Sequence, residues 1–301
     1  MYPTIFEYNG FVISSYGLML MTAFLVCNYL LRKHLNSINL DGKIADDIVF
    51  YAAIGGILGS KIYYIIEEKQ LYETYISISN ILKGIFTLNS EILALGISQF
   101  GGGLVFLGGL IGGMLTVSYY IRKNNLNWFE VSDWVAPYLA LGHCIGRLGC
   151  FLVGDCYGTI TNLPWKMTFQ NGLPATTYEN FSRYYPDLFN SDTFQSLYPA
   201  LKSSSNTLIY VHPTQLYESI LGFIIYIYLI NLRKKRLYNG MVMFEYLFLA
   251  GITRFLIEFI RLNPSYFLNF SGAQIVSIIM ILIASILMKI NNQKTYSYGK
   301  N

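Results

Sequence analysis

The chain has 301 residues and a formal net charge of +4, and 53% of its residues are hydrophobic, 16% aromatic and only 13% charged. Soluble domains average about 45–50% apolar and about 25% charged residues, so a soluble globule of this length would lack the polar residues to cover its surface. Runs of about 20 apolar residues cross the hydrocarbon core of a bilayer as helices, and several such runs are present.

We predict an all-α integral membrane protein with about seven transmembrane helices, forming a single membrane domain over residues 1–301. The segment that precedes the first apolar run has no basic stretch and no small-residue cleavage site, so we expect the run to be a spanning helix rather than a signal peptide. The predicted spans lie at residues 12–31, 44–66, 101–121, 134–154, 213–232, 240–260 and 272–290.

The distribution of Lys and Arg predicts the orientation of these helices. Basic residues are denser in the connections on one side of the predicted bundle, and cytoplasmic loops of membrane proteins show this excess. We therefore expect the N-terminus outside and the C-terminus inside. The basic run Arg233–Arg236 is interpreted as part of this topology pattern and not as a nucleic-acid site.

Two of the predicted outer connections are long. Residues 67–100 mix polar and apolar residues, which is compatible with short helices at the interface. Residues 155–211 are rich in Tyr, Ser, Thr, Asn and Pro, and we expect them to form a small extracytoplasmic cap.

Three basic residues fall inside predicted spans: Lys61, Arg147 and Arg254. An ionisable group near the bilayer centre costs at least about 2.5–3.5 kcal/mol, so each needs a partner or a watery cavity. In the predicted orientation all three lie in the outer half of the membrane. The polar residues Tyr16, Glu218 and Gln274 begin inward-running helices and fall at the same depth, which predicts one outward-facing polar cavity.

The sixth predicted helix carries Arg254, Glu258 and Arg261 at positions i, i+4 and i+7, on one helical face. The alternative is that these side chains pair with one another and extend to the lipid headgroups at the outer surface. This alternative applies above all to Arg261. Arg147 lies in a glycine-rich segment, residues 146–151. Guanidinium groups pair bidentately with phosphate, so two arginines in one cavity favour an anion site, and the anion at a membrane surface is a phospholipid headgroup.

Glycines are concentrated in the third predicted helix. The pairs Gly108/Gly112 and Gly109/Gly113, like Gly55/Gly59 in the second helix, have the G-x-x-x-G spacing that lets helices pack closely. The role of the triplet Gly101–Gly103 is left open, with its backbone N–H groups as possible donors to a ligand.

The order and spacing of several motifs resemble the prolipoprotein diacylglyceryl transferase family almost from end to end. The motifs are I-S-S-Y-G-L-M at 13–19, G-S-K-I-Y-Y at 59–64, G-G-L-V-F-L-G-G-L-I-G-G at 102–113, D-W-V-A-P-Y-L-A-L-G-H-C-I-G-R-L-G-C-F at 133–151, L-P-W at 163–165, H-P-T-Q-L-Y-E at 212–218, R-F-L-I-E-F-I-R at 254–261 and G-A-Q-I-V-S at 272–277.

This resemblance implies a transferase of the bacterial cytoplasmic membrane. It would move the diacylglyceryl group of phosphatidylglycerol to the lipobox cysteine of a prelipoprotein, forming a thioether and releasing glycerol phosphate, with no cofactor, metal or nucleic acid. The expected catalytic residues are Arg147, Arg254 and His212. The expected substrate-binding residues are Tyr16, Lys61, Gly103, Asp155, Glu258 and Arg261.

The chain departs from the family's motifs at the proposed base and near Arg147. Well-studied members have H-G-G where this chain has Leu107-Gly-Gly, and Leu107 cannot accept a proton. Their fourth-helix motif has two asparagines and a glutamate, which are replaced here by Cys150, Val153 and Asp155. His212 and His143 are candidates for a substitute base, although a lone helical histidine such as His143 is more often a hydrogen-bonded structural group.

The cysteines leave further alternatives open. Cys150 and Cys156 would lie on the oxidising side of the membrane, where a disulfide is possible. Ligation of a metal by Cys150, Asp155, Cys156 and His143 is a less favoured alternative. For the whole chain, the alternatives to the transferase are a divergent paralogue with another lipid or acceptor and a non-catalytic lipid-binding protein. A transporter is disfavoured because the inner halves of the predicted spans are largely apolar.

Overall fold

The computed structural model describes residues 2–8, 11–68, 71–101, 105–198, 207–267 and 269–298. The chain divides into two compact units, which are described separately below. The first contains residues up to 3, 14–23 and 135 onward, and the second contains residues 4–13 and 24–134.

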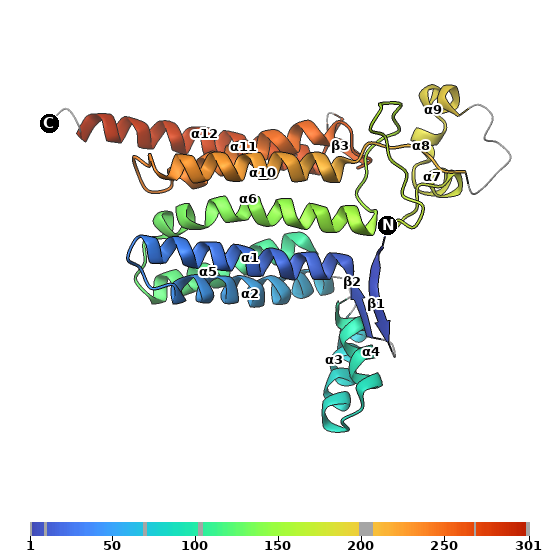
Figure 1. Cartoon of the computed structure of the whole chain (residues 1–301), viewed down its shortest axis with the longest axis horizontal. Helices are drawn as coiled ribbons and strands as arrows, with labels where there is room; N and C mark the ends of the chain where they lie inside the picture. Colours follow the sequence, from blue (N-terminus) through green and yellow to red (C-terminus); the bar gives the residue numbers. More distant parts are fainter. Residues whose placement is uncertain are drawn as a thin grey trace. The chain divides into compact units, whose positions relative to one another are not determined.

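Helices account for most of the described chain (Figure 1). In order they are α1 (Ser15–Ser37), α2 (Lys43–Glu68), α3 (Leu71–Phe86), α4 (Ser90–Gly101), α5 (Phe106–Lys123), α6 (Trp128–Val153), α7 (Tyr178–Tyr184), α8 (Pro186–Phe189), α9 (Asp192–Leu197), α10 (Thr214–Arg233), α11 (Met241–Glu258) and α12 (Gly272–Tyr298). Two short hairpins pair β1 (Thr4–Tyr8) with β2 (Phe11–Ser14) and β3 (Ser265–Phe267) with β4 (Phe270–Ser271).

The protein is an all-α integral membrane protein, as predicted. Among the described residues, five helices are long and apolar enough to cross a membrane: α1, α2, α6, α10 and α12. The predicted spans at 101–121 and 240–260 correspond to α5 and α11, which are 18 residues long. They are not among the five because of their charged residues: α5 ends in Arg122 and Lys123, and α11 carries Glu245, Arg254 and Glu258. The count of seven and the orientation stay predictions.

Several predicted boundaries differ from the observed ones. Residues 12–14 belong to β2 rather than to the first helix. Helix α6 begins at Trp128, six positions before the predicted start at 134, because its polar first turns include Glu130 at the N-terminal end, where an acidic side chain is favourable. The connection 67–100 contains two full helices, α3 and α4.

Helices α2 and α5 pack closely through their glycines. A side chain at Gly59 would clash with the backbone of Gly108 and Gly112, and one at Gly112 would clash with the carbonyl oxygen of Gly55. The hydroxyl of Thr116 donates a hydrogen bond to Tyr51 O (2.7 Å) across this contact. The predicted packing role of Gly55, Gly59, Gly108 and Gly112 is confirmed.

In the first unit, α10 packs against α11, and α11 against α12 (Figure 1). A buried apolar cluster joins α6, α10 and α11 through Ala136, Ala140, Ile225, Leu229 and Val242. Small residues on α6 let α10 approach: Gly222 of α10 faces the backbone of Ala140 and Cys144. These contacts hold the three helices that carry the charged residues described below.

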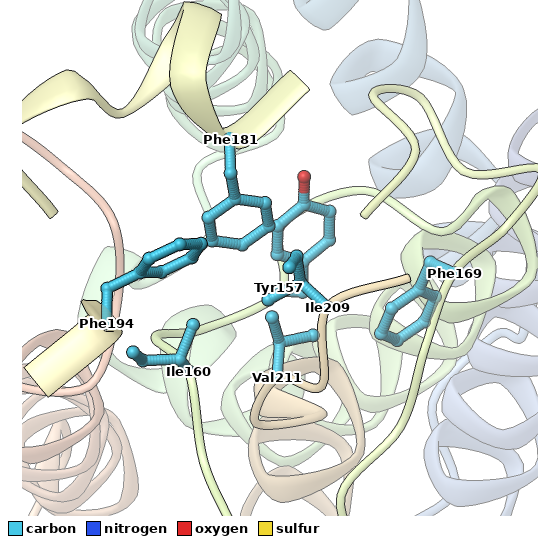
Figure 2. Packing of buried hydrophobic residues seen from close by; sticks show 7 residues of the cluster. All are labelled: Tyr157, Ile160, Phe169, Phe181, Phe194, Ile209 and Val211. Carbon is cyan, nitrogen blue, oxygen red and sulfur yellow. The ribbon is translucent and has the colours of Figure 1, made fainter. Parts of the chain in front are cut away.

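Residues 155–198 and 207–211 have an apolar core of their own, shown in Figure 2. The rings of Phe169 and Phe181 each stack on Tyr157, with interplanar angles of 18°. Backbone hydrogen bonds join Met167 and Val211 in both directions, at 3.1 and 2.9 Å. The fully buried members of the core are Phe169, Phe181, Phe194, Ile209 and Val211. We call this part of the chain the cap segment, and its position outside the membrane stays a prediction.

Candidate active site

Three of the residues predicted to share one depth, Arg147, Glu218 and Arg254, meet where the helices of the first unit reach the cap segment. Helices α6 and α11 end there, while α10 and α12 begin there (Figure 1). As a result Arg147, near the end of α6, Glu218, in the first turns of α10, and Arg254, near the end of α11, are neighbours despite their distance in sequence.

Glu218 is the centre of this group. Its side chain is only 5% exposed, and its two carboxylate oxygens contact four basic groups. Oε2 lies 2.8 Å from Arg147 Nη2 and 3.3 Å from His143 Nε2. Oε1 lies 3.2 Å from Arg254 Nη1 and 3.0 Å from Arg261 Nη1. A buried carboxylate with several charge-assisted hydrogen bonds holds its partners in defined positions.

Glu258 is the second carboxylate of the group. Its Oε2 lies 3.0 Å from Arg254 Nη2 and 3.9 Å from Arg261 Nε. Its Oε1 accepts hydrogen bonds from Asn263 (2.6 Å) and Ser271 (2.8 Å). Arg254, Glu258 and Arg261 therefore lie together, as their spacing predicted, and they are ion-paired as in the alternative given for them. Arg261 lies beyond the end of α11, which stops at Glu258.

The charges of this group do not cancel. Three guanidinium groups, of Arg147, Arg254 and Arg261, face the two carboxylates of Glu218 and Glu258. The guanidinium groups outnumber these two carboxylates by one, and the carboxyl group of Asp155 and the thiol of Cys156 lie beside Arg147. Arg147 and Arg254 keep part of their side chains exposed, at 15% and 27%. A partly exposed group of oriented arginines can bind an anion such as a phosphodiester.

The segment that follows α6 is bound to the start of α10 by the H-P-T-Q-L-Y-E motif. Thr214, fully buried, donates to Cys156 O (2.7 Å), and the buried amide of Gln215 donates to Asp155 O. The N–H of Gly158 donates to His212 O (2.9 Å). A side chain at Gly158 would clash with the carbonyl oxygen of Ile260, so glycine is required where this segment passes α11.

Cys150, Asp155 and Cys156 form a cluster beside Arg147. One ligand atom from each, the two thiol sulfurs and a carboxylate oxygen, all lie within 4.8 Å of one another. Cys150 and Cys156 are free thiols. A hydrogen bond from Cys150, with the guanidinium groups of Arg261 and Arg147, lowers the pKa of Cys156 below its ordinary value. Burial raises the pKa of Asp155 to about 6.

His212, the predicted base, lies at the start of α10 and not in the arginine group. Its Nδ1 is 3.3 Å from the hydroxyl of Tyr217, which accepts a hydrogen bond from Trp165 Nε1 (2.6 Å). Burial lowers the pKa of His212 below its ordinary value of 6.5. The imidazole is therefore neutral at pH 7, which is the state required of a proton acceptor.

The remaining predicted site residues have different outcomes. The ring of Tyr16 lies against Gly149, two residues from Arg147. Lys61 belongs to the other compact unit, where its ammonium group donates to Phe100 O (3.1 Å) and lies near the rings of Tyr64 and Phe100. Gly103 lies outside the described residues. The roles of Tyr16, Lys61 and Gly103 in binding substrate stay predictions.

Two residues of the group were not assigned to the site from the sequence. Glu218 was placed among the polar residues at the cavity's depth, but its central position between three arginines was not foreseen. The last residue of the H-P-T-Q-L-Y-E motif is the sequence feature that points to it. His143 was interpreted as a hydrogen-bonded structural group, and its contact with Glu218 confirms the hydrogen bond.

Comparison with known proteins decides the family. The family model described as prolipoprotein diacylglyceryl transferase matches residues 3–290. The chain belongs to the prolipoprotein diacylglyceryl transferase family. This confirms the resemblance drawn from the motifs over nearly the whole chain.

Three relatives named phosphatidylglycerol–prolipoprotein diacylglyceryl transferase illustrate the degree of similarity. The one from Clostridium tetani is 31% identical over 97% of this chain and 98% of its own length. The one from Finegoldia magna is 30% identical over 96% of this chain and 95% of its own length. The one from Thermotoga petrophila is 27% identical, covering 93% of this chain and 81% of its own. This member of the family therefore spans most of the length of these relatives.

Proposed function

We propose that this chain transfers the diacylglyceryl group of phosphatidylglycerol to the thiol of a prelipoprotein's lipobox cysteine. A carbon–sulfur bond forms, the bond between the glyceryl carbon and the phosphate oxygen breaks, and glycerol phosphate leaves with the bonding electrons. The observation that supports this proposal most is the arginine group, Arg147, Arg254 and Arg261, held by two carboxylates at the end of an apolar helix bundle.

The arginine group suits the phosphodiester of phosphatidylglycerol in charge and in position. The lipid headgroup carries one negative charge, and the three guanidinium groups outnumber the two carboxylates that hold them. Arg147 and Arg254 are the more exposed members, so in this proposal they contact the phosphate oxygens directly. Arg261, which is 9% exposed, supports them through the shared carboxylate of Glu218.

The same contacts would favour the reaction itself. Negative charge accumulates on the leaving phosphate as the carbon–oxygen bond breaks, and preorganised guanidinium groups stabilise that charge without reorganising at the moment of reaction. In this proposal Tyr16 and Asp155 border the pocket, and the neutral imidazole of His212 accepts the proton of the acceptor thiol.

The setting of the reaction follows from the helix orientation predicted from Lys and Arg. With the N-terminus outside, the arginine group and the cap segment face the outer leaflet of a bacterial cytoplasmic membrane. Phosphatidylglycerol reaches the site laterally from that leaflet, and the lipobox of a prelipoprotein signal peptide reaches it from the same side. No part of the reaction requires a nucleic acid, and the basic run Arg233–Arg236 serves the orientation.

The proposal is tested with purified full-length protein, vesicles and a lipobox peptide, and the products are analysed by mass spectrometry. With phosphatidylglycerol we expect a peptide that has gained a diacylglyceryl group in a thioether. Diacylglycerol, which has no phosphate, should give no product, and neither should a peptide with Ser in place of its Cys. The Clostridium tetani relative is assayed under the same conditions. If it modifies the Cys peptide and this protein does not, the proposal is overturned.

A further inference from the structure

The thiols of Cys150 and Cys156 have no role in the phosphate site described above, and Asp155 only borders it. We propose that these three residues bind a zinc ion whose fourth ligand is the thiolate of the acceptor cysteine. Binding of the ion does not depend on the proposed function, whereas the identity of the fourth ligand rests on it.

The donor atoms fit zinc in kind and in spacing. Zinc sites that act on substrates commonly have three protein ligands from Cys, His and carboxylates, and they leave a fourth position open. Tetrahedral Zn²⁺ with sulfur at about 2.3 Å and oxygen at about 2.0–2.2 Å places its ligands about 3.5–3.8 Å apart. The three ligand atoms lie within 4.8 Å of one another. Small rotations of the side chains would therefore close them around an ion.

The backbone turns back on itself to bring the two cysteines together. Cys150 is in the last turn of α6, and the chain reverses after Val153 through Gly154, at φ 77°, and Cys156, at φ 58°. A non-glycine residue in the left-handed region is uncommon. Thr214 and Gln215 hold this turn through the carbonyl oxygens of residues 155 and 156. The side chains of Asp155 and Cys156 are therefore not needed to anchor the turn.

One atom of the cluster lacks a partner. Oδ1 of Asp155 is buried and makes no hydrogen bond. A buried carboxylate oxygen without a donor or cation is unfavourable, and such groups in native proteins usually indicate an ion, a water or a functional role. This oxygen, beside two thiols, is a suitable third ligand.

The adjacent arginines are compatible with the ion. Ligation requires both sulfurs as thiolates, so any thiol proton still present leaves as Zn²⁺ enters. The guanidinium groups of Arg147 and Arg261 act on the side chain of Cys156. These N–H groups would share the negative charge of a ligating thiolate, as outer hydrogen bonds do in metal sites.

The ion would supply the activation that Leu107 cannot. A thiol bound to a zinc ion is deprotonated, and the thiolate is the nucleophile. The acceptor thiol would lose its proton to His212 on binding, and the zinc-bound sulfur would attack the glyceryl carbon. The carbon–oxygen bond then breaks toward the phosphate held by Arg147 and Arg254. The neutral thioether is a weak ligand, so it leaves and the position is open again.

The test measures the metal directly. Full-length protein purified in detergent under reducing conditions is equilibrated with Zn²⁺ or Co²⁺, and bound metal is counted by mass spectrometry. Thiolate ligation of Co²⁺ is observed as a sulfur-to-metal charge-transfer band. The variants are Cys150→Ser and Cys156→Ser. The matched control is Cys144→Ser, which alters a buried cysteine of the same helix that contacts Ser219 outside the cluster.

We expect one equivalent of zinc in the wild type and in Cys144→Ser. Each cluster variant should bind zinc at least about a hundredfold more weakly, because even changes outside the ligands themselves weaken metal sites by about 10–100-fold. If the serine variants do not fold, Asp155→Asn takes their place in the test. It keeps both thiols, so it should retain the cobalt band but bind the ion more weakly. Equal binding in wild type and cluster variants would overturn the site. A Cys150–Cys156 disulfide in protein isolated without reductant, with no bound metal, would also overturn it.

The fourth ligand is tested separately. A lipobox peptide added to the Co²⁺ protein should strengthen the charge-transfer band, and the peptide with Ser in place of Cys should leave it unchanged. An unchanged band with both peptides would overturn the acceptor's role as ligand. Full transfer activity after removal of the metal would also overturn the acceptor's role as ligand, and it would leave the proposed function intact. Metal binding without any transfer would leave the site intact and remove the proposed function.

Discussion

Arg147 Nη2 lies 2.8 Å from Oε2 of Glu218, and these two residues come from helices that run in opposite directions. The contact matters because Glu218 also holds Arg254 and Arg261 through its other oxygen. A single buried carboxylate thus determines where three guanidinium groups point. The geometry of the proposed phosphate site depends on this residue more than on any one arginine.

Replacement of Glu218 by Gln should therefore reduce transfer by about 100-fold or more, because a displacement of about 1 Å in a positioning group has that effect on a rate. It should also destabilise the protein by about 3–5 kcal/mol, since buried guanidinium groups lose their partner. Transfer rate and thermal unfolding in detergent are the measurements. Glu245→Gln, on α11 but outside the group, is the matched control and should change neither. Wild-type transfer in Glu218→Gln would show that the carboxylate does not position the arginines.

Much of the fold was predictable from the sequence, and the site only in part. Long apolar runs located most of the spanning helices, and the spacing of Arg254 and Glu258 predicted their contact, because both features are local. The central role of Glu218 was not predictable in the same way. Its partners lie 71, 36 and 43 positions away in the chain, and only the packing of α6 against α10 and α11 brings them together.

The polar segments were the other source of error. Residues 128–133 are helical although they are too polar to be identified from hydrophobicity alone. Helices α3 and α4 lie in the connection where short helices were compatible with the sequence, but their number and bounds were not predicted. The turn that joins Cys150 to Cys156 depends on backbone angles that the sequence does not reveal, apart from Gly154.

The contact between α2 and α5 predicts a difference between two adjacent glycines. Gly112→Ala should destabilise the protein by about 1–3 kcal/mol, because the new methyl group would overlap the backbone of Gly55 and Gly59. Gly113→Ala is the control, since the nearest atom to its methyl group, the carbonyl oxygen of Ala52, is 3.4 Å away. It should be neutral or stabilising by up to about 1 kcal/mol from helix propensity. Thermal unfolding of both variants in detergent checks this difference, and equal loss of stability would contradict the close packing.

The apolar core of the cap segment predicts a local effect of Phe181. Its ring is fully buried against Tyr157, so Phe181→Ala should destabilise the segment by about 3–5 kcal/mol. Limited proteolysis should then cut within residues 155–198 faster than in the wild type. Tyr184→Ala changes an exposed aromatic residue of the same helix, and its cleavage rate should stay unchanged. Equal cleavage rates in the two variants would argue against an independent core.

The lowered pKa of His212 predicts the pH dependence. As the pH falls, the imidazole of His212 takes up a proton near pH 6.5 in the unfolded chain and only at a lower pH in the folded chain. The free energy of unfolding therefore falls as the pH drops from about 6.5 through the lower folded pKa. If His212 accepts the thiol proton, kcat/KM should fall over the same acidic range. His212→Gln should lower transfer by about 10²–10⁴-fold and remove this acidic limb. His34→Gln, in the other compact unit, should leave the pH profile unchanged. A normal acidic limb in His212→Gln would exclude His212 as the base.

The central claim is that Arg147 and Arg254 hold the phosphate of phosphatidylglycerol while its glyceryl carbon is transferred. The most direct measurement is the rate of thioether formation by Arg147→Ala and Arg254→Ala, compared with Arg233→Ala. Arg233 lies at the far end of α10 and contacts Tyr138, so its loss leaves the arginine group intact. We expect each of the first two variants to lose about 10²–10³-fold in rate, and Arg233→Ala to keep the wild-type rate. Wild-type rates in folded Arg147→Ala and Arg254→Ala would contradict the account.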